Sequence, residues 1–348
     1  MTEALVPGLR QTADTAAEAS AEPVDIVYLW VDGSDPAWRR KRRRAAARLC
    51  AGHRDAMAVY GNVEGRFRDN DELRYNLRAL ERYFPAHGHV YLVTDGQRPS
   101  WLKASDRLTV IDHSALIPAG ALPTFDSGHI ESYIHRIPGL SERFLYLNDD
   151  VFLGSPVSLD DWFWPGGIYT AWSDEASVSD EPMRADGTAL MNACRLSHHW
   201  LSASEARPVA EYLPTFRTFA HAPRPMLRSV MFELECLAPD LFGSVRSTVF
   251  RVWNKPTIVS DFVMRWSLSR GRAKLRSYTH LFLATGAAHD DAEAQAALQT
   301  LVASEGKLDF FCLNDTTDDA PADDPRLLRA RAALQQMFAA PSSFEWAG

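Results

Sequence analysis

The stretch Arg143–Gly154 constrains the fold more than any other part of this chain. It opens with a short apolar and aromatic run, Phe144–Leu147, whose composition is typical of a buried strand. The run stops abruptly at Asn148, Asp149 and Asp150. Adjacent carboxylates at the end of a buried strand repel each other and lose hydration, so burying them costs free energy. A divalent cation would remove this cost, and a solvated turn that exposes both acids is the alternative interpretation.

Predicted strands and helices alternate around this stretch. β-Branched and aromatic runs at 24–31, 89–94 and 108–111 end in Gly or acidic residues, and helical patterns lie between some of them. This alternation predicts a Rossmann-like α/β layer over residues 24–153. In such open sheets, ligands bind at the carboxyl ends of the strands, which is where the acid pair lies.

Composition divides the rest of the chain into a leader, a long central region and a tail. Residues 1–22 are rich in Ala, Thr and Glu and are expected to be disordered. Residues 23–318 are expected to form the main domain, and 319–348 a tail with a helix near 325–339. With 348 residues, 46% of them hydrophobic, the chain can bury a large core.

Charge and cysteine usage exclude several classes of protein. The net charge of −8 argues against non-specific nucleic-acid binding, so no nucleic-acid partner is expected. The four cysteines lack C-x-x-C spacing, which argues against a zinc site or a disulfide framework and fits a reducing compartment; Cys312 is expected in the core. No apolar run approaches the roughly 20 residues that span a bilayer. We expect a cytoplasmic location, with at most peripheral contact at the inner face of the membrane.

Two arginine-rich segments are candidates for binding anions. The run Arg39–Arg44 is predicted to be a solvated helix face, with an anionic glycan or membrane contact as the alternative. The second segment surrounds the start of a helix that Asp69 or Asn70 can cap. Guanidinium groups near free backbone N–H groups make a good pyrophosphate clamp, and ordinary surface ion pairs are the alternative. These arginines are Arg66, Arg68, Arg74 and Arg78.

Two histidine-containing segments are candidate parts of a binding site. Glu131 and His135 are predicted to share one helix face, with Arg136 beside them. They could bind a substrate or pair with each other, and the spacing leaves both alternatives open. His221 is predicted to open a helix that includes Met226, and a histidine beside a proline is more often a structural cap than a catalyst.

Several blocks of the sequence, in order over most of residues 24–318, form a recognisable pattern. They are Asp25–Pro36, Arg66–Tyr75, Tyr91–Gln97, Pro123–Phe125, Ile130–Ser132, His135–Gly139 and Tyr146–Val151, followed by His221–Pro223 with Arg251, and by Phe310–Asp315. The blocks up to Val151 resemble the first two signature regions of the Stealth family, His221–Pro223 with Arg251 resembles the third, and Phe310–Asp315 the fourth. This family contains bacterial capsular polysaccharide phosphotransferases and the catalytic subunit of N-acetylglucosamine-1-phosphotransferase. The chain departs from the family pattern after Arg251, where no acidic residue follows within the next few positions.

The resemblance implies a sugar-1-phosphate transferase. Its fold would be a GT-A-type, Rossmann-like nucleotide-sugar core, with a helical C-terminal portion completing the site. The signature regions, near 24–36, 66–154, 221–270 and 309–318, would place the catalytic domain at 23–318. The enzyme would move N-acetylglucosamine-1-phosphate, or a related hexose-1-phosphate, from a UDP-sugar to a glycan or polysaccharide hydroxyl and release UMP. Mg²⁺ or Mn²⁺ would assist, and the sequence carries no indication of an oligomeric state.

The resemblance also assigns site residues by position. Catalytic roles fall to His221, Arg251, Asp150 and Asp149. The donor would bind to Trp30, Asp32, Gly33, Arg66, Asp69, Asn70, Arg74 and Asn148. The metal would bind to Asp149, Asp150, Asn314 and Asp315. Acceptor contacts are expected from Glu131, His135 and Arg136.

The chemistry of phosphoryl transfer suits these residue types, because it demands positioning and charge stabilisation more than covalent help from the protein. His221 is the first choice of base and Asp150 the second, while Arg251 would stabilise the transferring phosphate. Direct attack by the acceptor is the default, and a phosphorylated His221 intermediate is the alternative. A GT-A glycosyltransferase that releases UDP is the competing enzyme class, although Asn148-Asp149-Asp150 lacks the usual Asp-x-Asp spacing. A non-catalytic glycan-binding module would not need the arginines and the acid pair together.

Overall fold

The computed structural model describes residues 23–49, 51–285, 291–321 and 323–346. The predicted disordered leader, 1–22, lies outside the described residues. Within the described ranges, no helix combines the length and apolar character that a bilayer crossing requires.

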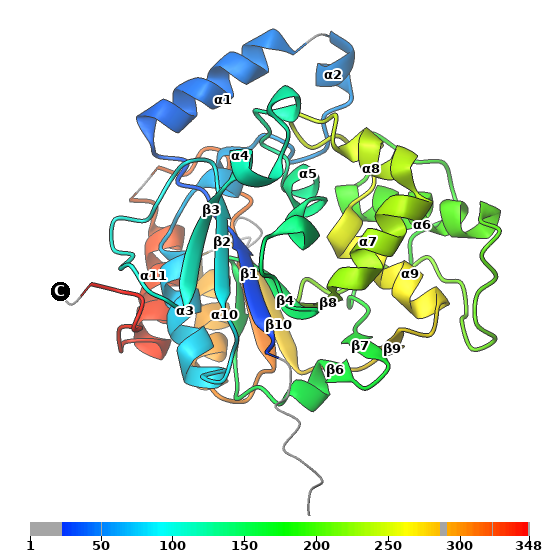
Figure 1. The fold of residues 1–348 in the computed structure, drawn as a ribbon. Coiled ribbons are helices and arrows are strands. Elements are labelled where there is room, and N and C mark those ends of the chain that lie inside the picture. Colours follow the sequence, from blue (N-terminus) through cyan, green and yellow to red (C-terminus); the bar gives the residue numbers. More distant parts are fainter. Residues whose placement is uncertain (1–22, 50, 286–290, 322, 347–348) are drawn as a thin grey trace, which may run out of the picture.

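A five-stranded sheet forms the centre of the molecule, in the order β3-β2-β1-β4-β8 (Figure 1). The first four strands are parallel, and β8 is antiparallel to β4. Strands β1 and β2 are buried along almost their whole length, as expected for parallel strands covered on both faces. The α/β prediction is confirmed. The strands are β1 (Asp25–Leu29), β2 (Val90–Thr94), β3 (Leu108–Asp112), β4 (Arg143–Asn148) and β8 (Arg224–Leu227).

Two smaller sheets extend this core. In the first, ordered β10-β11-β5, β11 is parallel to β10 and antiparallel to β5, with Cys312 opposite Val151. The chain turns directly from β4 into β5, so the acid pair lies where the large sheet meets this smaller one. The strands are β5 (Val151–Leu153), β10 (His280–Ala284) and β11 (Phe310–Asn314), and in the second small sheet β6 (Phe163–Trp164), β7 (Gly167–Thr170) and β9 (Ala273–Leu275).

Two groups of helices flank the large sheet: α3, α10 and α11 lie on the side of β1–β3, and α6 to α9 lie beyond β4 and β8 (Figure 1). The second half of the chain contributes strands β8 to β11 as well as the predicted helices. The α-helices are α1 (Pro36–Arg48), α2 (Ala51–Asp55), α3 (Glu72–Tyr83), α4 (His113–Leu116), α5 (Ser127–Glu131), α6 (Ala189–Ala203), α7 (Arg228–Leu237), α8 (Pro239–Val245), α9 (Val263–Ser269), α10 (Asp291–Ala303) and α11 (Pro325–Met337). Short 3₁₀ turns are η1 (Glu64–Phe67), η2 (Ala119–Ala121), η3 (Ile134–Arg136) and η4 (Leu159–Asp161), and a π-helical turn, η5, covers Ile258–Phe262.

The start of α1 follows from its sequence, whereas the start of α3 differs from the prediction. Asp35 caps α1 by accepting a hydrogen bond from the backbone N–H of Ala37, and a proline follows it. The N-cap of α3 is Asp71, in a left-handed conformation with φ of 65° and without a side-chain cap. The predicted caps Asp69 and Asn70 lie just outside the helix, so their side chains are available for other contacts.

The C-terminal segment folds back onto α3. Helix α11 packs against α10 and α3. Beyond it, the buried Glu345 carboxylate accepts hydrogen bonds from Arg78 Nε and Nη2, both at 2.7 Å, and from Arg74 Nε at 2.5 Å. The Glu345 carboxylate and the Arg78 guanidinium are therefore paired in a buried environment.

Replacing Glu345 with Ala is expected to lower the free energy of unfolding by about 3–5 kcal/mol, because the buried Arg78 guanidinium loses its counter-charge. Urea denaturation followed by circular dichroism measures the change. The control is Glu305→Ala, which removes a partly exposed pair with Arg82 and should cost no more than about 1 kcal/mol. Equal losses in the two variants would contradict the importance of the buried pair.

Candidate active site

A cavity of about 650 Å³ opens at the carboxyl ends of β1, β2 and β4. Its size is within the range of small-molecule sites, and its position is the one where open α/β sheets bind ligands. Segments from both halves of the chain line it. The predicted site residues among them are Trp30, Arg66, Glu131, Asn148, Asp149, Asp150, His221, Arg251, Asn314 and Asp315.

The acid pair occupies the tight turn between β4 and β5. The buried Asn76 on α3 holds this turn, because its side-chain amide donates to the backbone carbonyls of Asp149, at 3.0 Å, and Val151, at 2.7 Å. The same side chain accepts a hydrogen bond from the Tyr28 hydroxyl on β1. Asn76 is a positioning residue that sequence reasoning missed, because in the sequence it is indistinguishable from an ordinary polar residue of a helix.

The two adjacent carboxyl groups have opposite protonation tendencies. Burial and the neighbouring charge of Asp150 raise the pKa of Asp149 well above its usual range. Burial would also raise the pKa of Asp150, but the nearby His221, Cys312 and Asn314 outweigh it and lower that pKa. Such divergence between neighbouring titratable groups is typical of sites that carry out acid–base chemistry.

His221 lies beside Asp150, with Nε2 3.6 Å from Asp150 Oδ1. The predicted helix at this position is wrong: His221 belongs to a loop, β8 follows, and the helix α7 begins only at Arg228. The β-strand forms because the segment pairs with β4, as with Met226 opposite Phe144. The loop position leaves the His221 ring partly exposed to the cavity.

Arg66 and Arg251 both line this cavity, and their positive charges are not fully balanced by neighbouring acids. Burial and the positive charge of Arg251 lower the pKa of Arg66 to about 9. The Nε atoms of both arginines are buried, and within the described ranges neither atom has a hydrogen-bond partner. Arg251 Nη2 donates to the Ser127 hydroxyl, and Arg251 Nε lies 3.6 Å from Asp126 Oδ1. Two guanidinium groups held near each other favour an anionic ligand between them.

A second set of acids lies at the start of α3. Burial and the charge of Asp71 raise the pKa of Asp69 to about 7. Burial and the charge of Asp69 raise the pKa of Glu72 to about 8. Glu72 lines the cavity and accepts hydrogen bonds from the backbone and side chain of Asn70.

The stability of the metal-free protein is therefore expected to fall as the pH rises from about 4 to about 8. In this window the folded state keeps protons on Asp69 and Glu72 that the unfolded chain has already lost, so the unfolded chain gains in relative stability. Melting temperatures in EDTA across this range measure the slope. Glu72→Gln should flatten it, whereas Glu305→Gln, at a partly exposed ion pair, should leave it unchanged. An unchanged slope in Glu72→Gln would contradict the buried-acid assignment.

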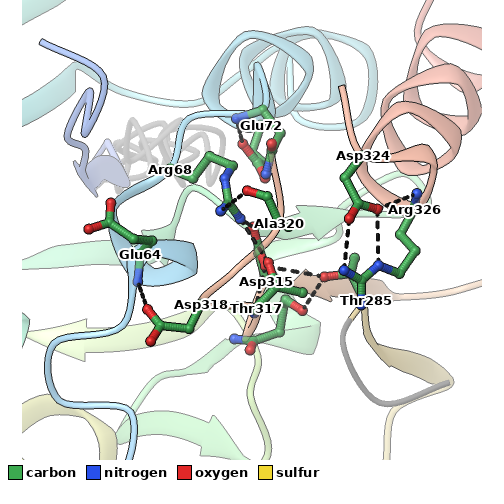
Figure 2. Close-up of polar contacts among 12 residues, drawn as sticks. Glu64, Arg68, Glu72, Thr285, Asp315, Thr317, Asp318, Ala320, Asp324 and Arg326 are labelled. Atoms are coloured by element: carbon green, nitrogen blue, oxygen red, sulfur yellow. Dashed lines mark hydrogen bonds and ion pairs between the residues drawn. The ribbon is translucent and has the colours of Figure 1, made fainter. Parts of the chain in front are cut away.

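The oxygen-rich part of the site fits a hard divalent cation. Asp150 Oδ1 is buried without a hydrogen-bond partner among the described residues, and Asn314 Nδ2 lies 3.1 Å from Asp150 Oδ2. Burial and the charges of neighbouring acids raise the pKa of Asp149. Carboxylates and an amide oxygen are suitable ligands for Mg²⁺ or Mn²⁺. Asp315 does not fit this role. Figure 2 shows its carboxylate engaged by Arg68 and Thr317, which compensates its charge within the protein.

Comparison with known proteins agrees with the resemblance of the sequence blocks. Residues 22–50 match the family model described as Stealth protein CR1, conserved region 1, and residues 66–170 match Stealth protein CR2, conserved region 2. This chain belongs to the Stealth family. Both matched regions contribute to the cavity, the first through Trp30 and Trp38 and the second through Arg66 and the acid pair.

The relatives of this Stealth chain include exopolysaccharide phosphotransferases. One from Streptomyces coelicolor is 37% identical over 339 residues, which cover 96% of this chain and 54% of that protein. CpsY from Mycobacterium leprae is 30% identical over 331 residues, covering 92% of this chain and 57% of that protein. The chain thus spans little more than half the length of these relatives. The crystal structure of the galactosyltransferase LgtC aligns with a TM-score of 0.42 and 8% identity, covering 91% of this chain and 98% of that chain.

Several predicted site residues of the Stealth chain lie elsewhere. Arg74 pairs with Glu345 rather than lining the cavity. His135 and Arg136 both contact Glu235 on α7, through His135 Nε2 at 2.7 Å and Arg136 Nη2 at 2.6 Å. Helix α5 ends at Glu131, so His135 belongs to a separate 3₁₀ turn and does not share its helix face. Glu131 does line the cavity, where it accepts a hydrogen bond from the Tyr146 hydroxyl.

Asp32 and Gly33, in the turn after β1, make local and backbone hydrogen bonds and do not line the cavity. Asp32 Oδ1 accepts hydrogen bonds from the Ser34 backbone and hydroxyl. The Gly33 N–H donates to the Phe67 carbonyl at 2.7 Å, and a Cβ at Gly33 would lie 2.1 Å from that oxygen. Glycine is therefore required for the first conserved region to approach the second. Asp69 and Asn70 adjoin the cavity through Glu72 without lining it themselves.

Cavity residues that sequence reasoning missed include two aromatic side chains. Phe282 on β10 is half exposed, and its ring centroid lies 6.0 Å from that of His221. Tyr60 is also half exposed and has a φ of 61°, which is unusual for a residue other than glycine. The sequence offers no periodic signal for either, because their positions depend on strand pairing and loop conformation.

Proposed function

We propose that this chain transfers a sugar-1-phosphate from a UDP-sugar to a hydroxyl group of an exopolysaccharide, and releases UMP. The observation that carries this proposal is the convergence of Arg66 and Arg251 with the Asp150–His221 pair in one cavity. Positive charge that lines a cavity suits the two phosphates of a nucleotide sugar, and a histidine beside a carboxylate suits deprotonation of an acceptor. The names of the relatives support the exopolysaccharide acceptor. N-acetylglucosamine-1-phosphate is the proposed group transferred.

In this proposal His221 removes the proton from the acceptor hydroxyl, while Asp150 orients the imidazole and stabilises its positive charge. The acceptor oxygen attacks the phosphorus that carries the sugar, and the bond from that phosphorus to the bridging oxygen breaks. UMP leaves with the bridging oxygen. Arg66 and Arg251 stabilise the charge that develops on the two phosphates. A divalent cation bound to Asp149, Asp150 and Asn314 would supply further charge neutralisation.

The decisive experiment uses UDP-N-acetylglucosamine labelled with ³²P in the phosphate next to the sugar. It is incubated with the enzyme, MgCl₂ and a panel of simple sugars and exopolysaccharide fragments. The expected result is labelled glycan together with UMP in equal amounts. UDP released in step with unlabelled glycan would overturn the proposal in favour of a glycosyltransferase, and the Asp150→Asn variant serves as the negative control.

A further inference from the structure

Three side chains with different ligand atoms converge at one end of the cavity. The carboxylate of Asp150, the imidazole of His221 and the thiol of Cys312 each offer one atom, and these atoms all lie within 4.8 Å of one another. His221 Nε2 is 3.6 Å from Asp150 Oδ1, and Cys312 Sγ is 3.5 Å from Asp150 Oδ2. The scattered cysteines of the sequence gave no sign of this cluster, because it forms through the pairing of β11 with β5.

Strand pairing explains why the thiol reaches the acid. Cys312 lies opposite Val151, the residue that follows Asp150, and the Leu313 N–H donates to the Asp150 carbonyl at 3.0 Å. Cys312 and Asn314 are two residues apart on β11 and therefore share one face of the strand. Both side chains contact Asp150 Oδ2, which leaves Asp150 Oδ1 to face His221.

The cluster has unused binding capacity. Asp150 Oδ1 and His221 Nε2 are both buried, and neither has a hydrogen-bond partner in the part of the chain that the structure describes. In a tetrahedral zinc site, ligand distances of about 2.0–2.3 Å place the ligand atoms roughly 3.3–3.8 Å apart. The separations of 3.6 Å and 3.5 Å, which go to the two different oxygens of Asp150, are of this size, so side-chain movements would bring one carboxylate oxygen, the imidazole nitrogen and the sulfur to one ion. The fourth position would open into the cavity.

We propose that Asp150, His221 and Cys312 form a binding site for Zn²⁺, and that Zn²⁺ bound there inhibits the enzyme. The donor set of one oxygen, one nitrogen and one sulfur atom favours a borderline ion such as Zn²⁺ over Mg²⁺, which prefers oxygen alone. Binding replaces the thiol proton of Cys312, which is released to solvent, and uses the Nε2 lone pair of His221. The inhibitory part rests on the proposed function, because it withdraws His221 from the acceptor and competes for Asp150.

Cobalt binding tests the site without any need for turnover. Co²⁺ added to the metal-free protein should produce the thiolate-to-cobalt charge-transfer absorption in the near ultraviolet, and Zn²⁺ should abolish it. Calorimetry with ZnCl₂ should detect one site that Cys312→Ser weakens at least about 100-fold, since even the loss of groups that only support ligands costs 10–100-fold. Cys194→Ser is the matched control, because Cys194 is also a buried free thiol but lies outside the cavity.

Two outcomes would overturn the metal site: wild-type protein without the cobalt band, or Cys312→Ser with unchanged zinc affinity. Should Cys312→Ser fail to fold by circular dichroism, His221→Gln on the exposed side of the cluster tests the same ligand set. In the labelled-donor assay, the same Zn²⁺ concentration should inhibit the wild type and Cys194→Ser by half. Cys312→Ser should require a Zn²⁺ concentration at least about tenfold higher. Normal zinc binding by an enzyme that releases no UMP would refute the proposed function alone, whereas turnover insensitive to bound Zn²⁺ would refute the inhibition.

Discussion

Asp150→Asn is expected to lower kcat by about 10³-fold, within the range that one oriented acid–base group contributes. The carboxylate contacts His221, Cys312 and Asn314, so its charge serves both the base and the proposed cation. The amide keeps the size of the side chain but cannot stabilise a protonated imidazole or neutralise a divalent ion. Release of UMP from labelled donor under saturating substrate measures the effect.

The fold of Asp150→Asn should survive, because Asn76 holds this turn through backbone carbonyls, which the substitution leaves in place. Its melting temperature is expected to fall only slightly, since the amide loses the contact with His221 that favours the charged carboxylate. Asp161→Asn, at a surface ion pair with Arg276, is the control and should retain full activity. Asp150→Asn with kcat near the wild-type value would exclude this carboxylate from the reaction.

Arg66→Gln and Arg251→Gln are expected to lower kcat/KM for the UDP-sugar by about 10²–10³-fold each, comparable to the loss of one preorganised donor at a developing charge. Each variant leaves a single guanidinium for the two phosphates. Because the two cations repel each other in the free enzyme, Arg66→Gln should not lower the melting temperature. Arg251→Gln also loses the contacts with Asp126 and Ser127, so a modest decrease is expected for that variant. Steady-state kinetics with varied donor concentration measure the first effect, and thermal denaturation the second.

Arg74→Gln provides a sharp control for these variants. Arg74 belongs to the same arginine-rich segment, but it pairs with Glu345 outside the cavity. It should keep the wild-type KM for the donor and lose only stability. If Arg74→Gln weakened donor binding as strongly as Arg66→Gln, the division of this segment into a cavity part and a structural part would be incorrect.

The fold and one part of the candidate site follow from local sequence. The apolar run before Asp149 and Asp150 is a strand, and the acids lie at its carboxyl end because the neighbouring strands are parallel. Asp35 and Pro36 start α1 as their residue types predict. In these cases the deciding interactions lie within a few residues, or follow from the general geometry of parallel sheets.

The remaining site residues depend on distant partners. His135 and Arg136 look like binding residues until Glu235, about a hundred positions later, is seen to engage both. Arg74 and Arg66 belong to the same arginine-rich segment, and nothing in the neighbouring sequence distinguishes their roles. The ion pair of Arg74 with Glu345, on the C-terminal segment, does so. His221 carried no local signal of its own, and its candidacy came from the resemblance of motifs. The role of Cys312 requires knowledge of which strand pairs with β5.

The pairing of β11 with β5 has a consequence for how the protein is made. The ribosome releases the chain from its N-terminus, so the acid pair emerges 164 residues before Asn314. During that interval the parallel strands can assemble, but the carboxylates still lack Asn314 and Cys312, and for much of it His221 and Arg251 as well. An unfinished chain would therefore hold only part of the cavity lining, and the carboxylates would meet their partners on β11 only after that strand has paired with β5.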